Sequence, residues 1–202
     1  MNAYKFLAAG AVGRFSDVPW PQPPLEGDAE WLEADGPPEQ CRHGVHACEV
    51  DRLLDWIDEE LWEVELDGVA EREPLLVAAR GRLRRRVPGW DEDAARDFAD
   101  ACAERVREHA AAAVDSVAKT LTAFAADCRL LARGARPDAP DAPDVPASAP
   151  AAAAIAANLG FVAAHAAGFA AASGSADDER YTAGFLAERS WQLDWLRRRL
   201  AL

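Results

Sequence analysis

Apolar and polar residues alternate along two stretches of the first half of the chain. In Leu61–Leu66, alternation places Trp62, Val64 and Leu66 on one face of a strand and Glu63 and Glu65 on the other, and Asp67-Gly68 predicts a turn after it. Val45–Val50 alternates in the same way, and a third strand begins at 75–79 and continues into the arginines before Val87. The pattern predicts a small, mostly antiparallel sheet.

At Trp90 the apolar period changes from two to 3.6 residues, which is typical of helices. Asp91 predicts the N-cap of one long helix over 92–133 that ends at Gly134. Two further helices are expected at about 150–172 and 176–200. The apolar stripe of the long helix comprises Phe98, Cys102, Val106, Val114, Val117, Leu121, Phe124 and Cys128 or Leu131.

Strands followed by helices predict the α+β class. We expect a β-rich domain over 1–88 and a helical region over 91–202, whose three helices pack on the sheet or on one another. Five prolines among alanines and aspartates at 135–150 predict an extended linker inside the helical region.

The chain has a formal net charge of −13 and a pI near 4.7, which disfavours binding to nucleic acid or to anionic membranes. No signal peptide is visible, and the apolar run 147–173 is mostly alanine, so we expect a packed soluble helix there. Four cysteines do not make a disulfide scaffold in 202 residues. These features predict a reduced, cytoplasmic protein, and the alanine- and arginine-rich composition is typical of a high-GC bacterium.

Two cysteines and two histidines lie within the eight residues Cys41–Cys48. Thiolate and imidazole are zinc ligands, so Cys41, His43, His46 and Cys48 are candidates for a tetrahedral metal site. The Cys-x-His-x-x-His-x-Cys spacing differs from paired Cys-x-x-Cys knuckles, and a bend at Gly44 would be needed to bring the four together. The alternative is a strand with Cys48 in the core and His46 hydrogen-bonded inside.

His46 is also a candidate general acid or base, because imidazole titrates near neutral pH. Glu63 and Glu65, on one face of the strand expected beside it, are the candidate carboxylates that would orient or pair with the ring. A Cys–His thiol pair lacks an evident oxyanion loop. The alternative for Glu63 and Glu65 is a solvated strand face.

The basic tract Arg80–Arg86 presents Arg80, Arg82, Arg84 and Arg86 on one side if it is a regular strand. Arg80 and Arg82 are candidate contacts for a small anionic ligand. The alternatives are internal pairing with acidic residues of the long helix and contact with nucleic acid.

The last helix places aromatic, acidic, basic and amide side chains near one face, which suits either a core or a ligand cavity between helices. His109 and His165 are lone helical histidines and are expected to be structural. No Walker loop, Gly-x-Gly-x-x-Gly, Gly-x-Ser-x-Gly or His-Glu-x-x-His occurs, so no cofactor is expected. The candidate ligand-binding residues of this helix are Tyr181, Glu188, Arg189, Gln192 and Trp195.

Cys41, Gly44–Cys48, Leu61–Gly68 and Leu76–Ala79 together resemble an uncharacterised small domain of phage and bacterial proteins, over about residues 5–87. Its pattern is a cysteine, then Gly-x-His-Ala-Cys, an acidic-hydrophobic strand ending in glycine, and a Val/Ala-rich strand. The resemblance implies a fold unit and no reaction, and His43 is outside the pattern. The C-terminal Glu188-Arg189, Gln192 and Trp195-Leu196 resemble the tails of helical, immunity-like actinobacterial proteins.

These features lead us to expect a bacterial protein that binds a small organic molecule through His46, Glu63 and Glu65. It would be a cofactor-independent isomerase, cyclase or lyase of secondary metabolism. Two alternatives stay open. One is a non-enzymatic interaction, immunity or self-resistance protein that binds a protein partner, and the other is a metal-binding module.

Overall fold

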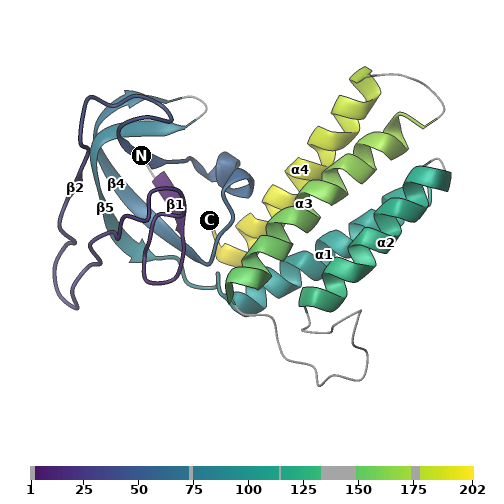
Figure 1. Ribbon diagram of the computed structural model, residues 1–202, viewed down its shortest axis with the longest axis horizontal. Coiled ribbons are helices and arrows are strands. Elements are labelled where there is room, and N and C mark those ends of the chain that lie inside the picture. The colour runs from purple at the N-terminus through teal and green to yellow at the C-terminus, as the bar shows by residue number, and fades with distance from the viewer. Residues whose placement is uncertain (1–2, 73–74, 114, 133–148, 174–177) are drawn as a thin grey trace. The chain divides into compact units, whose positions relative to one another are not determined.

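The structure is a computed structural model that describes residues 3–72, 75–113, 115–132, 149–173 and 178–202. The chain forms two compact units, Met1–Trp90 and Asp91–Leu202. All described strands belong to the first unit and all described α-helices to the second (Figure 1). The α+β class expected from the sequence is confirmed.

The first unit is built on an antiparallel sheet with the order β1-β4-β5-β2, in which β3 also pairs with β5. Tyr4 and Cys48 exchange two backbone hydrogen bonds of 2.8 and 2.9 Å, so the chain after β3 also pairs with β1. These pairings join β1, β4, β5 and β3 into a closed ring. The elements are β1 (Ala3–Leu7), β2 (Leu32–Glu33), β3 (Val45–Ala47), the 3-10 helix η1 (Val50–Asp55), β4 (Glu60–Glu71) and β5 (Leu76–Arg86).

Apolar side chains from every strand of this ring fill its interior. Trp62 and Val64 of β4 are buried there, as the alternation predicts, and Trp20 from the loop before β2 joins them. At Gly81 of β5 a Cβ atom would lie 2.7 Å from Val45 Cγ1 and 3.1 Å from Leu66 Cδ2. A glycine therefore fits where these two side chains pack closely over β5.

One local prediction for this unit is wrong. Asp67-Gly68 does not form a turn, because β4 continues through it and Asp67 pairs with Arg80 in the ladder. Gly68 has φ +67° beside an irregularity in strand register between Val69 and Glu71, so its glycine serves a bulge and not a hairpin loop. Asp51 lies within the short 3-10 helix η1, which begins after Glu49 and has no side-chain cap.

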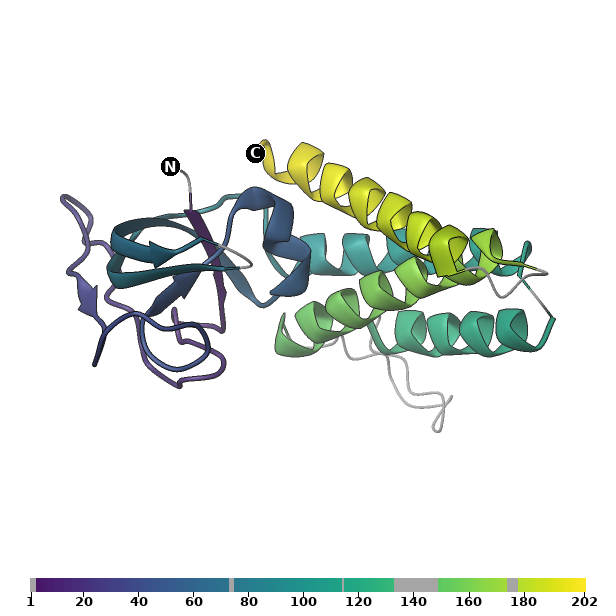
Figure 2. The same cartoon turned by 90° about the horizontal axis from the view of Figure 1, so that it is seen from above.

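The second unit contains α1 (Glu92–Ala110), α2 (Asp115–Ala132), α3 (Ala149–Ala171) and α4 (Asp178–Leu200). Both views show the helices running side by side (Figures 1 and 2). Asp91 caps α1 as expected, because its carboxylate accepts a hydrogen bond of 2.8 Å from Ala94 N. The expected linker falls mainly on residues 133–148, which are outside the described residues.

The single long helix expected over 92–133 is wrong, because a turn at 111–113 separates α1 from α2, which packs on α1 and α3. A continuous helix of that length would extend about 63 Å, whereas α3 extends about 35 Å. Because the chain reverses direction at the turn, α1 and α2 can both pack along α3. Phe98, Cys102 and Val106 of the expected stripe are fully buried, but Phe124 is 45% exposed.

Helix α3 packs against α1, α2 and α4, which explains its composition. It carries alanine or glycine at most positions and no charged residue. Ala151–Ala171 has the length and mean hydropathy, 1.5, of a membrane-spanning helix, but 56% of that stretch is buried inside the protein. A buried core helix of a soluble protein has these same properties, and this agrees with the expectation of a packed helix.

Candidate functional site

His46 is held by the loop that precedes it. Its Nδ1 lies 3.0 Å from Gly44 O, and its Nε2 accepts a hydrogen bond of 3.2 Å from Cys41 N. One neutral tautomer satisfies both contacts, with the proton on Nδ1. Both ring nitrogens therefore contact the backbone of residues 41–44, and the half-buried ring fixes the shape of this loop.

The four candidate zinc ligands do not converge. Cys41 and His43 are exposed, whereas Cys48 is buried and its thiol donates to Tyr4 O at 3.5 Å. Burial raises the pKa of Cys48 to about 12, so the thiol stays protonated at neutral pH. Among the described residues, no group of three or more His, Cys, Asp and Glu side chains is placed to hold a metal ion. The geometry gives a zinc site here no support.

The structure also separates His46 from its candidate carboxylates. His46 pairs with Val77 of β5, whereas Glu65 pairs with Arg82 from the other side of the same strand. Strand β5 lies between them, and five residues along a strand correspond to about 16 Å. The strand of Glu63 and Glu65 is not the direct neighbour of His46, because β5 lies between them on one side of the ring and β1 on the other. A proton-transfer pair of His46 with either glutamate stays a prediction that the geometry does not support.

Glu63 and Glu65 instead pair with arginines across the β4–β5 ladder. Glu63 accepts two hydrogen bonds from Arg85, at 2.8 and 2.5 Å. Glu65 accepts from Arg82 Nε and Arg82 Nη2, both at 2.9 Å, and from Arg84 at 3.2 Å. Both carboxylates are thus paired with arginines of the basic tract.

The candidate anion contacts Arg80 and Arg82 are also paired inside the first unit. Arg80 binds Asp67 at 2.7 Å, and Arg82 binds Asp28 at 2.8 Å. Both guanidinium groups lie 4.7 Å from the ring centre of Trp31. Internal pairing of the tract is one of the alternatives given by the sequence. The acidic partners, however, lie on β4 and in the loop before β2, and not on the long helix as expected. An irregularity in register at Glu63/Val64 also places Arg85, instead of Arg84, opposite Glu63.

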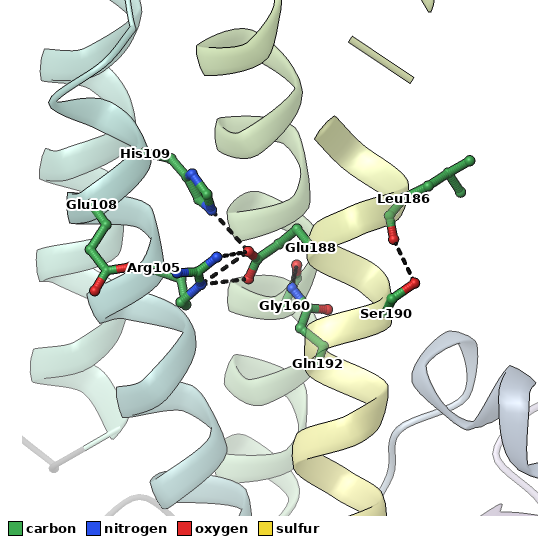
Figure 3. Close-up of polar contacts among 8 residues, drawn as sticks. All are labelled: Arg105, Glu108, His109, Gly160, Leu186, Glu188, Ser190 and Gln192. Atoms are coloured by element: carbon green, nitrogen blue, oxygen red, sulfur yellow. Dashed lines mark hydrogen bonds and ion pairs between the residues drawn. The ribbon is translucent and has the colours of Figure 1, made fainter. Parts of the chain in front are cut away.

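In the second unit, Glu188 is the centre of a buried charge cluster between α4 and α1 (Figure 3). Its side chain is fully buried and accepts hydrogen bonds from Arg105 Nη2 at 2.7 Å and from His109 Nε2 at 2.8 Å. Arg105 also binds Glu108 at 2.5 Å and lies over the ring of Trp191 at 4.9 Å. Burial favours the neutral acid, but the hydrogen bonds from His109 and Arg105 outweigh it and hold the pKa of Glu188 below its usual value.

The other candidates of α4 also face the bundle. Gln192 is fully buried; its amide donates to Gly160 O at 2.7 Å and accepts from Arg189 at 3.4 Å. Trp195 packs on Phe98 of α1 with ring centres 5.2 Å apart. Gln192 and Trp195 thus lie on the face of α4 that packs against other helices, and their side chains make contacts between helices. The part of the chain that the structure describes has a surface depression of about 430 Å³. None of the candidate ligand-binding residues lines it; its lining comprises Asp178, Glu179, Thr182, Ala183 and Leu186.

Tyr181 belongs to an aromatic surface shared by α3 and α4, which comprises Phe161, His165, Phe169, Tyr181 and Phe185 and is named here the α3/α4 aromatic surface. His165 Nδ1 is hydrogen-bonded to the Tyr181 hydroxyl. Partial burial lowers the pKa of His165 and raises that of Tyr181, so both are neutral at pH 7. Phe161 is 55% exposed and Phe169 42% exposed. The candidate Tyr181 thus supports an exposed apolar surface.

Sequence reasoning missed Lys5 and Arg105. Lys5 Nζ donates to His46 O at 2.7 Å and lies 5.4 Å from the Trp20 ring centre. Burial lowers its pKa to about 8. Lys5, one of two lysines, lies on the same face of its strand as the buried Ala3 and Leu7. Arg105 lies within the apolar stripe between Phe98 and Val106. Each of the two therefore interrupts an apolar pattern. Such interruptions were the available signal.

Comparison of the chain with family models, with curated proteins and with solved structures finds no match in any of the three.

Proposed function

We propose that this chain is a non-enzymatic interaction protein that binds a protein partner through the α3/α4 aromatic surface. The observation that carries the proposal is the exposure of Phe161 and Phe169, 55% and 42%, on a helix without charged residues. Clustered exposed aromatic side chains on a folded protein are typical of an interaction site.

The rings of this surface are held in place before any partner arrives. Phe161 and His165 have ring centres 4.3 Å apart, and Phe169 and Tyr181 are 5.2 Å apart, both in edge-to-face contact. The His165–Tyr181 hydrogen bond ties α3 to α4 beneath them. A surface ordered in advance loses little side-chain entropy on binding, which favours affinity.

The charges nearby indicate the chemistry of the partner. Asp178 is exposed in the first turn of α4, three residues before Tyr181 and on the same side of the helix, and the whole chain carries −13. An apolar helix flanked by lysine or arginine would complement this surface. The small-molecule function expected around His46 has no comparable support, because β5 separates His46 from Glu63 and Glu65.

The proposal is tested by replacing Phe161 with the photo-crosslinker benzoylphenylalanine and irradiating cells that express the full chain. We expect a discrete heavier adduct whose yield falls at least tenfold when Phe169→Ser is added, because that substitution removes the neighbouring apolar contact. The matched control carries the crosslinker at Phe124 of α2, which is similarly exposed at 45%. Circular dichroism checks that the variants stay folded. Equal adducts from positions 161 and 124, or none from 161, would contradict the proposal.

A further inference from the structure

Helix α4 has a second face, opposite the one that packs in the bundle. Residues spaced alternately by four and three positions lie on one side of a helix, as in the seam of a coiled coil. This spacing connects six residues, named here the outer seam of α4: Glu179, Ala183, Leu186, Ser190, Leu193 and Arg197. The first four are exposed, Leu186 by 56%, and the last two are half-buried.

The outer seam is complementary to a second copy of itself when the two helices are antiparallel. An antiparallel second copy places Glu179 opposite Arg197, Ala183 opposite Leu193 and Leu186 opposite Ser190. Each contact then joins an acid to a base or a large side chain to a small one, and every contact occurs twice. A two-fold interface requires this kind of self-complementarity.

The charged ends of α4 favour the same orientation. Its first turn carries Asp178 and Glu179, and its last turn carries Arg197, Arg198 and Arg199. An antiparallel pair brings unlike ends together, whereas a parallel pair brings like ends together. Within one chain Arg197 reaches Asp194 at 3.7 Å, a surface contact worth too little to hold it there. The seam itself has one acid and one base, so the net charge of −13 is not concentrated at the contact.

The surface over the N-terminal half of the seam is a shallow, open depression of about 430 Å³, whose lining includes Glu179, Ala183 and Leu186. In the antiparallel register, Leu193 of a second copy would enter this depression and Arg197 would reach Glu179. The hydroxyl of Ser190 donates to Leu186 O at 3.0 Å, so it needs no new partner when covered (Figure 3).

We propose that two copies of this chain associate through the outer seam of α4, antiparallel about a two-fold axis between Leu186 and Ser190. The occupant is a second copy because every position of the seam is matched by the seam itself. The inference is independent of the proposed partner-binding function, since no seam residue belongs to the α3/α4 aromatic surface.

Sedimentation equilibrium of the full chain from 1 to 200 µM tests association directly. We expect the mass to rise from 21.8 kDa towards twice that value with concentration. Leu186→Glu places a carboxylate at the centre of the seam and should weaken the dimer at least tenfold. The matched control is Phe124→Glu, an exposed apolar residue of α2, which should leave the dimer unchanged.

A charge exchange tests the orientation. Glu179→Arg alone and Arg197→Glu alone should each weaken association, and the double variant should restore it, because each new arginine again faces a glutamate. In a parallel pair the single variants would keep like charges opposed and the double variant would rescue nothing. A mass of 21.8 kDa at every concentration, a dimer indifferent to Leu186→Glu, or a double variant as weak as the single ones would overturn the proposal.

Discussion

Glu188 shows how this protein stabilises a buried charge. Its side chain is fully buried, while Arg105 and His109 are 26% and 21% exposed. The carboxylate therefore depends on two donors that keep part of their hydration. Removing one member of such a group is more costly than the net worth of the group, because the remaining charges lose their partner.

We expect Glu188→Gln to lower the free energy of unfolding at pH 7 by about 2 kcal/mol, since a neutral amide cannot balance Arg105. The native pKa of Glu188 is below its unfolded value of about 4.3, so the stabilisation is complete above that value and disappears as pH falls through the native pKa. Urea unfolding at pH 7 and pH 3 should show the difference between wild type and variant shrinking.

Glu104→Gln is the matched control for this variant. Glu104 is half-exposed and pairs with Arg107 on the same helix, so its loss should change stability by less than about 0.5 kcal/mol. A deficit in Glu188→Gln that stays constant from pH 7 to pH 3 would contradict the role of the charge.

The side chains that carry polar chemistry were identified from the sequence more readily than their partners. Alternation placed Glu63 and Glu65 on one face correctly, but it could not show that β5 separates them from His46. Partners such as Arg105 and Glu188 are 83 positions apart, and no local period relates them. Pairing between elements is decided by packing, which a single sequence does not display.

Among the secondary-structure elements, small residues set the distance between α3 and α4. A Cβ atom added at Gly184 would lie 2.6 Å from Ala167 O and 2.7 Å from Ala171 Cβ. At Gly160 the nearest atoms, on Gln192 and Phe98, would be 3.3 Å away and belong to side chains. Close approach at Gly184 is against backbone, which cannot move without shifting a helix.

We therefore expect Gly184→Ala to destabilise the bundle, although alanine favours an isolated helix by about 1 kcal/mol over glycine. Gly160→Ala should have a smaller effect, because side chains can adjust. Thermal unfolding followed by circular dichroism should give a lower Tm for Gly184→Ala than for Gly160→Ala. The reverse order would show that the α3–α4 contact is not limited by backbone approach.

The elements themselves were predictable where the period was strong and the boundary was chemically marked. Asp91 marks the start of α1, and prolines precede α3. The turn at 111–113 lies in a run of alanines, which carries no stop signal in the sequence, and both helices that it joins pack on α3. Asp67-Gly68 gave a false signal because a bulge and a turn both use a glycine at positive φ.

At the scale of the whole molecule, tryptophan fluorescence reports mainly on the first unit, whereas helical circular dichroism reports on the second. Of the seven tryptophans, Trp20, Trp31, Trp56, Trp62 and Trp90 lie in Met1–Trp90, and two lie in α4. Because each unit has its own buried core, urea unfolding followed by fluorescence and by ellipticity at 222 nm should give transitions that do not coincide. Chains of residues 1–90 and 91–202 should reproduce the two transitions separately. Coincident curves that both shift on truncation would show one cooperative unit.

Helix α3 has a consequence for how the protein is made. This stretch of uncharged residues has the length and mean hydropathy of a membrane-spanning helix, although it is mostly buried in the folded protein. Synthesis proceeds from the N-terminus, so α1 and α2 emerge first and can cover α3 before α4 has been translated. The order of the helices along the chain thus allows the apolar surface of α3 to pack on α1 and α2 while α4 is still being translated.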